Sequence, residues 1–252
     1  MSRPTAASGF PWGIWALSAL ALYAGTIILK YKYLDLALGD TDDAMRLVQL
    51  RTFLQHGNWF DLHLSRVAPP EGYVSHWSRI PDALMAIIYW FTLPFSSMAV
   101  AEKAVRIVYP GLWMIPAFTA ISYFAFRLTS NRLVVVVTLL MLVLNPATFT
   151  QFVAGRIDHH NAQITLALVT VIASALQRLD WRFAIISGLS GGLLLTIGLE
   201  AIPFVVIAAA ACAVNYVINE DGEKPTQFFA LSLAGATLIG HLLSYSPSNV
   251  LV

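Results

Sequence analysis

Cysteine is almost absent from this chain of 252 residues, and charged side chains are scarce. The single cysteine, Cys212, lies in an apolar run, so it excludes an intrachain disulfide and a cysteine-based metal site and is interpreted as a packing residue. Charged residues make up only 12%, whereas a soluble domain carries about 25%. The formal net charge is +1, which supplies no basic surface for nucleic acid, so no nucleic-acid partner is predicted.

Hydrophobic residues are abundant, at 58%, and the mean hydropathy is +0.69. A membrane-spanning helix needs about 20 mostly apolar residues. Seven segments fit, some of them short: 12–30, 104–126, 133–150, 163–178, 183–199, 201–218 and 227–244. The first is too long for a typical signal-peptide core and is predicted to be an uncleaved signal anchor. No linker separates domains, so we predict an all-α, multi-pass membrane protein in which residues 1–252 form a single transmembrane domain.

Arginines set the predicted orientation, because short loops that carry Lys and Arg stay in the cytoplasm. The arginines placed there are Arg3, Arg127, Arg132, Arg178 and Arg182. These positions agree with one another if the apolar segment 81–95, which Pro94 interrupts, lies in the interface or re-enters without spanning. Lys30 and Lys32, at the outer end of the first helix, argue mildly against this orientation.

Two polar islands stand out in this apolar sequence. The first, Gly-Asp-Thr-Asp-Asp at 39–43, opens a long external loop at about 40–103, and the second, Gly-Arg-Ile-Asp-His-His-Asn at 155–161, fills an external loop at about 151–162. With 81–95 not spanning, both islands face the extracytoplasmic side. Charged and imidazole side chains beside hydrocarbon are costly and need a compensating partner, for which a divalent cation is the obvious candidate.

The first island is predicted to begin a helix over 43–55, with Thr41 or Asp42 as its N-cap and Gly57 after its end. An imperfect apolar stripe suits a helix that lies along the membrane surface. Ordinary capping by acids at a helix start is the competing interpretation. Farther along the same loop, Trp77 is predicted to belong to an interfacial aromatic belt.

The second island contains Asp158 and His160 in an i, i+2 arrangement, which points both side chains the same way in an extended segment. A carboxylate oxygen and an imidazole nitrogen suit Mn²⁺ or Mg²⁺ and tolerate Zn²⁺. A polar turn without metal is the alternative.

The order of these motifs resembles a known family. A first transmembrane helix runs into Asp-x-Asp-Asp-x-x-x-Arg, a long loop contains Pro-Glu-Gly, and Gly-x-x-Asp-His-His follows a hydrophobic pair. This is similar to the N-terminal membrane half of oligosaccharyltransferase catalytic subunits of the archaeal and bacterial single-subunit type, which belong to the GT-C class of polyprenyl-lipid-dependent glycosyltransferases. The resemblance implies a GT-C-like bundle of about seven transmembrane helices, with interfacial helices in the first external loop, in a bacterial inner or archaeal cell membrane.

In that family a carboxylate of the first external loop and an Asp-x-Asp or Asp-x-His pair of the second hold the catalytic cation. Carried over, the resemblance implies Asp42 (or Asp43), Asp158 and His160 as ligands of Mn²⁺ or Mg²⁺. The family's Trp-Trp-Asp motif has no counterpart here, and its C-terminal part is expected to be absent. Glu200, which ends segment 183–199, is a candidate third contributor as ligand or base, with a hydrated helix end as the competing explanation.

The implied chemistry is transfer of a sugar from a polyprenyl phosphate or pyrophosphate, on the extracytoplasmic side, to a protein or glycan acceptor. Asp42, Asp43 and Glu200 are the predicted catalytic carboxylates, since one that metal does not saturate can accept the acceptor's proton. Arg46, Arg79 and Arg156 are predicted to grip phosphate oxygens, and the apolar helices to cradle the lipid. A GT-C enzyme that adds a single sugar to a hydroxyl, or a transporter or channel, are the alternatives.

Overall fold

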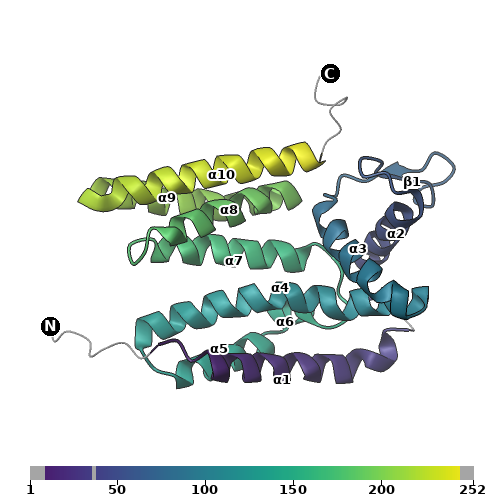
Figure 1. Ribbon diagram of the computed structural model, residues 1–252, viewed down its shortest axis with the longest axis horizontal. Coiled ribbons are helices and arrows are strands. Elements are labelled where there is room, and N and C mark those ends of the chain that lie inside the picture. The colour runs from purple at the N-terminus through teal and green to yellow at the C-terminus, as the bar shows by residue number, and fades with distance from the viewer. Residues whose placement is uncertain (1–8, 36–37, 245–252) are drawn as a thin grey trace.

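The computed structural model describes residues 9–35 and 38–244 (Figure 1). Its helices are α1 (Trp12–Lys30), α2 (Thr41–His56), α3 (Ile80–Thr92), α4 (Met98–Thr129), α5 (Leu133–Leu144), α6 (Pro146–Phe152), α7 (His160–Leu176), α8 (Arg182–Ile197), α9 (Ile202–Ile218) and α10 (Glu223–Ser244). Single 3-10 turns are η1 (Tyr31–Tyr33), η2 (Leu93–Phe95), η3 (Leu199–Ala201) and η4 (Glu220–Gly222). The short strands β1 (His63–Leu64) and β2 (Tyr73–Val74) pair antiparallel, with His63 opposite Val74. Arg3, which the orientation argument used, lies outside the described residues.

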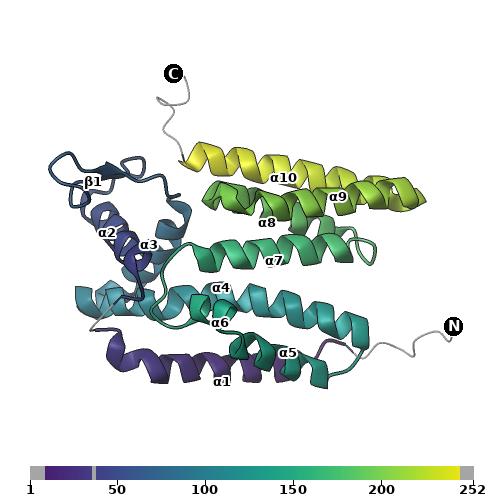
Figure 2. The same ribbon diagram turned by 180° about the vertical axis from the view of Figure 1, so that it is seen from behind.

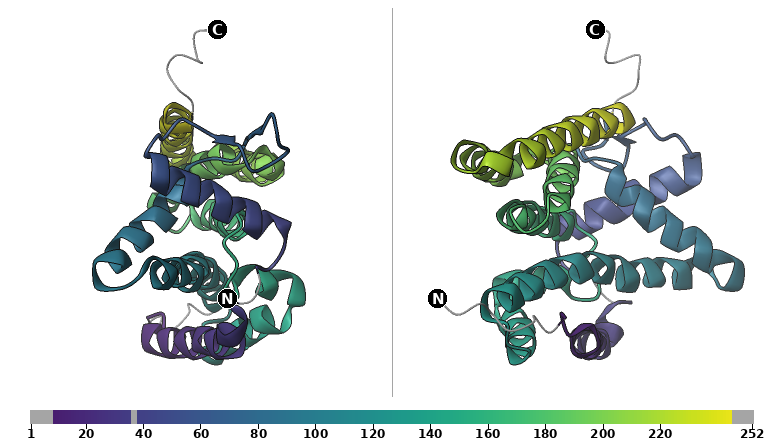
Figure 3. Two further views of the ribbon diagram at one scale, coloured as in Figure 1. Left: turned by 90° about the vertical axis from the view of Figure 1, so that its right-hand side faces the viewer. Right: turned by 60° about the vertical axis from the view of Figure 1, so that its left-hand side comes forward.

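The long helices lie side by side along one axis, in the packing order α1, α5, α4, α7, α8 and α10, with α9 beside α7 and α10 (Figure 1 and Figure 2). Helices α2 and α3 instead cross one end of this bundle, where α2 lies across its face (Figure 3). That end also carries the starts of α4 and α7, whereas the α4–α5 and α7–α8 connections lie at the opposite end. Segment 81–95 therefore forms a helix that does not run with the others.

The exterior of the bundle is apolar, as an all-α membrane protein requires. Four helical stretches are long and apolar enough to cross a membrane: Trp12–Tyr33, Met98–Thr129, Leu199–Ile218 and Glu220–Ser244. Leu17, Val217 and Leu231 on these stretches are 72%, 81% and 71% exposed. Exposed apolar surface of this extent is unfavourable in water and is stable in contact with lipid.

Two local expectations need correction. The predicted helix 133–150 is divided at Asn145, whose ψ of 106° lies outside the helical region because Pro146 follows it. The N-cap of α2 is Asp40, not Thr41 or Asp42: its side chain accepts hydrogen bonds from the amides of Asp42 and Asp43 at 3.1 and 3.0 Å. The helix ends as predicted, with Gly57 in the left-handed conformation (φ 67°).

A buried cluster holds α2 and α3 against α4. Leu50, Met85, Val105 and Tyr109 are fully buried in it, and so is Ile157 from the segment before α7. Each fully buried aliphatic side chain of this size contributes about 1.5–3 kcal/mol. This cluster therefore places the segment around the second polar island beside α2.

Helices α8 and α10 pack through glycine. A Cβ built on Gly192 would lie 2.6 Å from the Ala236 Cβ and 2.8 Å from the Leu233 carbonyl oxygen, so only glycine permits this approach. Gly188, one turn earlier, meets α10 in the same way and completes a Gly-x-x-x-Gly face. Small residues of this kind let helix backbones approach closely in lipid.

We expect Gly192→Leu to separate α8 from α10 and to lower the free energy of unfolding by about 1–3 kcal/mol through overpacking. Gly235→Leu is the matched control, because a Cβ at Gly235 in α10 has nothing within 4 Å. Unfolding in mixed detergent micelles measures both. An equal effect of the two substitutions would contradict the close packing at Gly192.

Candidate functional site

The site begins at the N-terminus of α2, which the Asp40 cap orients toward the segment before α7. Asp43, in the first turn of α2, is fully buried there. Its Oδ1 accepts hydrogen bonds from the backbone amides of Ile157 at 2.8 Å and of Asp158 at 3.0 Å. Gly39 makes room for this contact, since a Cβ at that position would collide with the Asp43 carboxylate and lie 3.1 Å from Arg156 Nη1. The two polar islands of the sequence are thus in direct contact.

Arg156 connects three carboxylates. Its Nη1 donates to Asp40 and, at 2.9 Å, to Asp43 Oδ2, and its Nη2 lies 3.4 Å from Asp158 Oδ2. Gln151 Oε1 accepts a further hydrogen bond from Nη2 at 3.0 Å. The guanidinium is therefore the positive centre of a cluster with more carboxylates than one cation balances.

The three carboxyl groups respond differently to this environment. Burial raises the pKa of Asp43 and outweighs the amide hydrogen bonds and the Arg156 charge that lower it. Burial acts to raise the pKa of Asp40 and of Asp158 as well, but contacts with cationic groups outweigh it, and both pKa values are lowered. The hydrogen bond from Arg156 holds the pKa of Asp40 below its ordinary value, and His159 and His160 do the same for Asp158. Asp158 is therefore ionised over a wide pH range.

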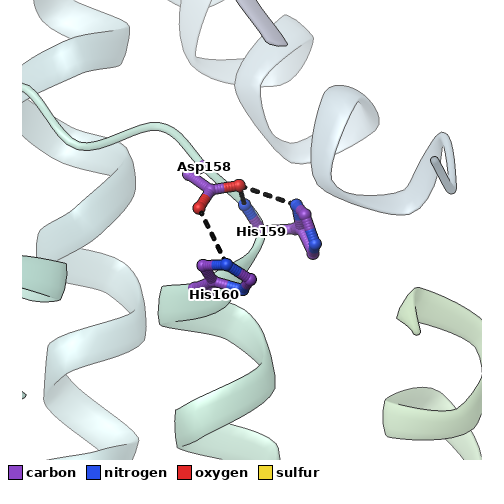
Figure 4. Close-up of side chains that lie close together, drawn as sticks. All are labelled: Asp158, His159 and His160. Carbon is purple, nitrogen blue, oxygen red and sulfur yellow. Dashed lines mark hydrogen bonds and ion pairs between the residues drawn. The ribbon is translucent and has the colours of Figure 1, made fainter. Parts of the chain in front are cut away.

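Asp158, His159 and His160 form the metal-capable group among the residues that the structure describes (Figure 4). One potential ligand atom from each lies within 4.8 Å of the others. Asp158 Oδ1 accepts the His159 backbone amide at 2.6 Å and lies 2.7 Å from His159 Nδ1, while Oδ2 lies 3.6 Å from His160 Nε2. His160 is the first residue of α7, so the group lies at the start of that helix, with Asp158 and His159 buried and the His160 side chain exposed.

A chain of hydrogen bonds continues from His160 to Glu200. Gln163 Nε2 donates to Glu200 Oε2 at 3.0 Å, which leaves Gln163 Oε1 as the acceptor 2.9 Å from His160 Nδ1. Neutral His160 then carries its proton on Nδ1, and Nε2 presents a lone pair toward Asp158 Oδ2. In this neutral form two acceptor atoms face each other, so a cation between them, either a proton on His160 or a metal ion, completes the contact.

The structure places the predicted arginines in two groups. Arg156 lies in the Asp-rich cluster, but Arg46 and Arg79 are 1% exposed and engage Asp82 of α3 at 3.1 and 3.2 Å. Their guanidinium groups are held within the first loop, so the structure does not bring them to Arg156. That Arg46 or Arg79 contacts phosphate stays a prediction, because both guanidinium groups are paired with Asp82.

The predicted carboxylates also separate. Asp158 and Glu200 belong to the connected group, and Asp43 contacts the second island, whereas Asp42 is half-buried and lies outside the metal-capable group of the described residues. A metal role for Asp42 stays a prediction. Sequence reasoning missed Asp40, which helix-capping preference at a Gly-Asp start favours, and Gln163, for which no sequence signal exists.

Trp77 was also misjudged, because it does not lie in an exposed belt. Its side chain is 9% exposed and packs between loops, with the Arg46 guanidinium carbon 4.6 Å and the His159 ring 4.9 Å from its ring centroid.

Three hollows adjoin the cluster. Arg156 and Asp40 line one of about 450 Å³ with Lys30. His159 and Glu200 line a second, of about 560 Å³, with residues of α8 and α10. The third is an apolar groove of about 420 Å³ between α7 and α9, with Gln163 and Glu200 at its polar end.

Comparison with known proteins adds no assignment, since no family model, curated protein or solved structure matches the chain.

Arg156→Gln is expected to lower the free energy of unfolding by about 3–5 kcal/mol, because it leaves buried carboxylates without their cation. Arg51→Gln is the matched control: the Arg51–Glu102 pair is 43% and 22% exposed, and exposed pairs contribute about 1 kcal/mol or less. Unfolding in mixed micelles compares them. Similar losses for both variants would argue against the central role of Arg156.

Proposed function

We propose that the protein is a membrane glycosyltransferase of the GT-C type, which moves a sugar or oligosaccharide from a polyprenyl-phosphate or -pyrophosphate carrier to a protein or glycan acceptor on the extracytoplasmic side. The observation that carries the proposal is the approach of Asp158 Oδ2 to His160 Nε2, 3.6 Å apart, within the metal-capable Asp158–His159–His160 group. Two acceptors without a proton between them repel, and a divalent cation relieves this. In the proposed topology seven passes cross the membrane, formed by α1, α4, α5–α6, α7, α8, α9 and α10.

The donor set fits Mn²⁺ or Mg²⁺. Asp158 supplies a carboxylate oxygen that is ionised over a wide pH range, and Gln163 fixes the His160 tautomer that exposes Nε2. A bound cation would screen the carrier phosphate and stabilise charge on the leaving oxygen. Arg156, whose Nη2 lies 3.4 Å from the same Asp158 Oδ2, is the arginine that we propose contacts the phosphate.

The apolar groove between α7 and α9 suits the prenyl chain. Ala167, Val171 and Phe204 line it, and its polar end at Gln163 and Glu200 leads to His160. A lipid in this groove would place its head group beside the carboxylate–imidazole group. The separate hollow lined by His159 and Glu200 would take the acceptor, so that the two substrates approach from different sides.

Glu200 is exposed and adjoins both of these hollows. In the proposed step the acceptor oxygen or nitrogen forms a bond to the sugar's anomeric carbon, and the bond from that carbon to the phosphate oxygen breaks. Glu200 accepts the proton that the acceptor loses. Arg156 stabilises the negative phosphate as it leaves.

Asp158→Ala is expected to lower Mn²⁺ affinity more than about 100-fold and to abolish transfer from a lipid-linked sugar, because it removes the central ligand. Asp42→Ala tests the first-loop carboxylate that the family resemblance implies, and loss of binding is expected there too. Asp221→Ala, at the exposed η4 turn, is the matched control and should leave both unchanged. Electron paramagnetic resonance of Mn²⁺ in nanodiscs measures affinity. Unchanged Mn²⁺ binding and transfer in Asp158→Ala would overturn the proposal.

Gln163→Leu is expected to weaken Mn²⁺ binding about 10–100-fold without removing a ligand, because it frees His160 to take the other tautomer. Gln227→Leu is a suitable control, since the exposed Gln227 donates a hydrogen bond to Glu223 at 2.8 Å within its own helix turn. The same resonance titration separates the two. Equal affinity of Gln163→Leu and the unsubstituted protein would show that the tautomer does not matter.

A further inference from the structure

The first loop contains a buried ionic centre that the proposed reaction does not use. Asp82, fully buried at the start of α3, accepts hydrogen bonds from Arg46 at 3.1 Å, Arg79 at 3.2 Å and Gln49 at 2.6 Å. Removing one partner of such a buried group strands the remaining charge, so the position of each guanidinium is strongly determined. Arg46 is therefore a rigidly held cation.

Trp77 connects this cation to the second loop. The Arg46 guanidinium carbon lies 4.6 Å from the Trp77 ring centroid, within the range of a cation–π contact, and the His159 ring lies 4.9 Å away at an angle of 50°. Gln49 also donates to the Trp77 carbonyl at 3.5 Å, which ties the backbone of this residue to α2. The indole thus has little freedom to move.

His159 passes this constraint to Asp158. The imidazole is 6% exposed, and its Nδ1 lies 2.7 Å from Asp158 Oδ1 without forming an aligned hydrogen bond. The His159 backbone amide donates to the same oxygen at 2.6 Å. Oδ1 is therefore occupied, and Oδ2 is the oxygen that faces His160 (Figure 4).

We propose that Trp77 is a positioning residue for the Asp158–His160 group: held by the Arg46–Asp82 ion pair, its ring fixes the His159 imidazole and so determines which Asp158 oxygen faces His160. The expected effect on ion binding rests on the proposed function, whereas the contact between Trp77 and His159 does not. A ring at position 77 is required because a flat side chain covers both the guanidinium and the imidazole.

The contact is tested without metal by reacting the histidines with diethyl pyrocarbonate and mapping the products by mass spectrometry. His160, whose side chain is 45% exposed, is the internal reference, and His159 should react far more slowly in the unsubstituted protein. In Trp77→Leu, His159 should react at a rate approaching that of His160. Trp77→Phe should keep most of the protection, as should the control Trp90→Leu, which removes an indole that is 52% exposed on α3. Continued protection of His159 in Trp77→Leu would overturn the inference.

The consequence is tested by Mn²⁺ titration of the same proteins. Trp77→Leu should lower the affinity about tenfold, with Trp77→Phe and Trp90→Leu close to the unsubstituted protein. An exposed His159 with unchanged affinity would also overturn the positioning role. If the unsubstituted protein bound no Mn²⁺, the proposed function would fall, while the labelling would still decide whether Trp77 holds His159. Trp77→Met, which keeps bulk without a ring, replaces Trp77→Leu in both measurements if that variant does not fold.

Discussion

The carboxylate of Asp43 is buried and needs hydrogen-bond partners, and this need joins the first polar island to the second. Asp43 is shielded from water, and its partners are the amides of Ile157 and Asp158 and the Arg156 guanidinium. Without them an ionised carboxylate would cost several kcal/mol, so the segment before α7 must stay against α2. Because the amide of Asp158 is itself one of these donors, the same contact determines where the Asp158 side chain lies.

The contact between Asp43 and the second island also explains where the other polar groups of the site lie. His160 starts α7 directly after it, and the α8–α9 connection brings Glu200 to the same end of the bundle. Helices whose outer surfaces are apolar carry this end, so lipid can cover the rest of the molecule. The lipid-linked substrate that we propose would match this division, because its tail and its head group need opposite environments.

The three arginines predicted to bind phosphate illustrate what a one-dimensional pattern hides. Arg46 and Arg79 lie in a loop rich in turns, where an exposed guanidinium is a reasonable expectation, yet both are buried against Asp82. Asp82 lies 36 residues from Arg46 in the chain, so no local pattern links them. Arg156, by contrast, lies inside the polar island that the site is built from.

The sequence alone determined the apolar segments, since hydrocarbon length and composition are local properties: α1 covers 12–30 as predicted, and α7 to α10 lie within a few residues of their expected bounds. It also marked both polar islands, because charge beside apolar runs is rare. Only the tertiary structure decided that Asp43 makes the contact between the islands and that Trp77 and Gln163 support the histidines. The contact between the islands joins residues 114 positions apart in the chain. Which groups meet over such a separation is settled by the need to pair buried charges and donors in the folded molecule.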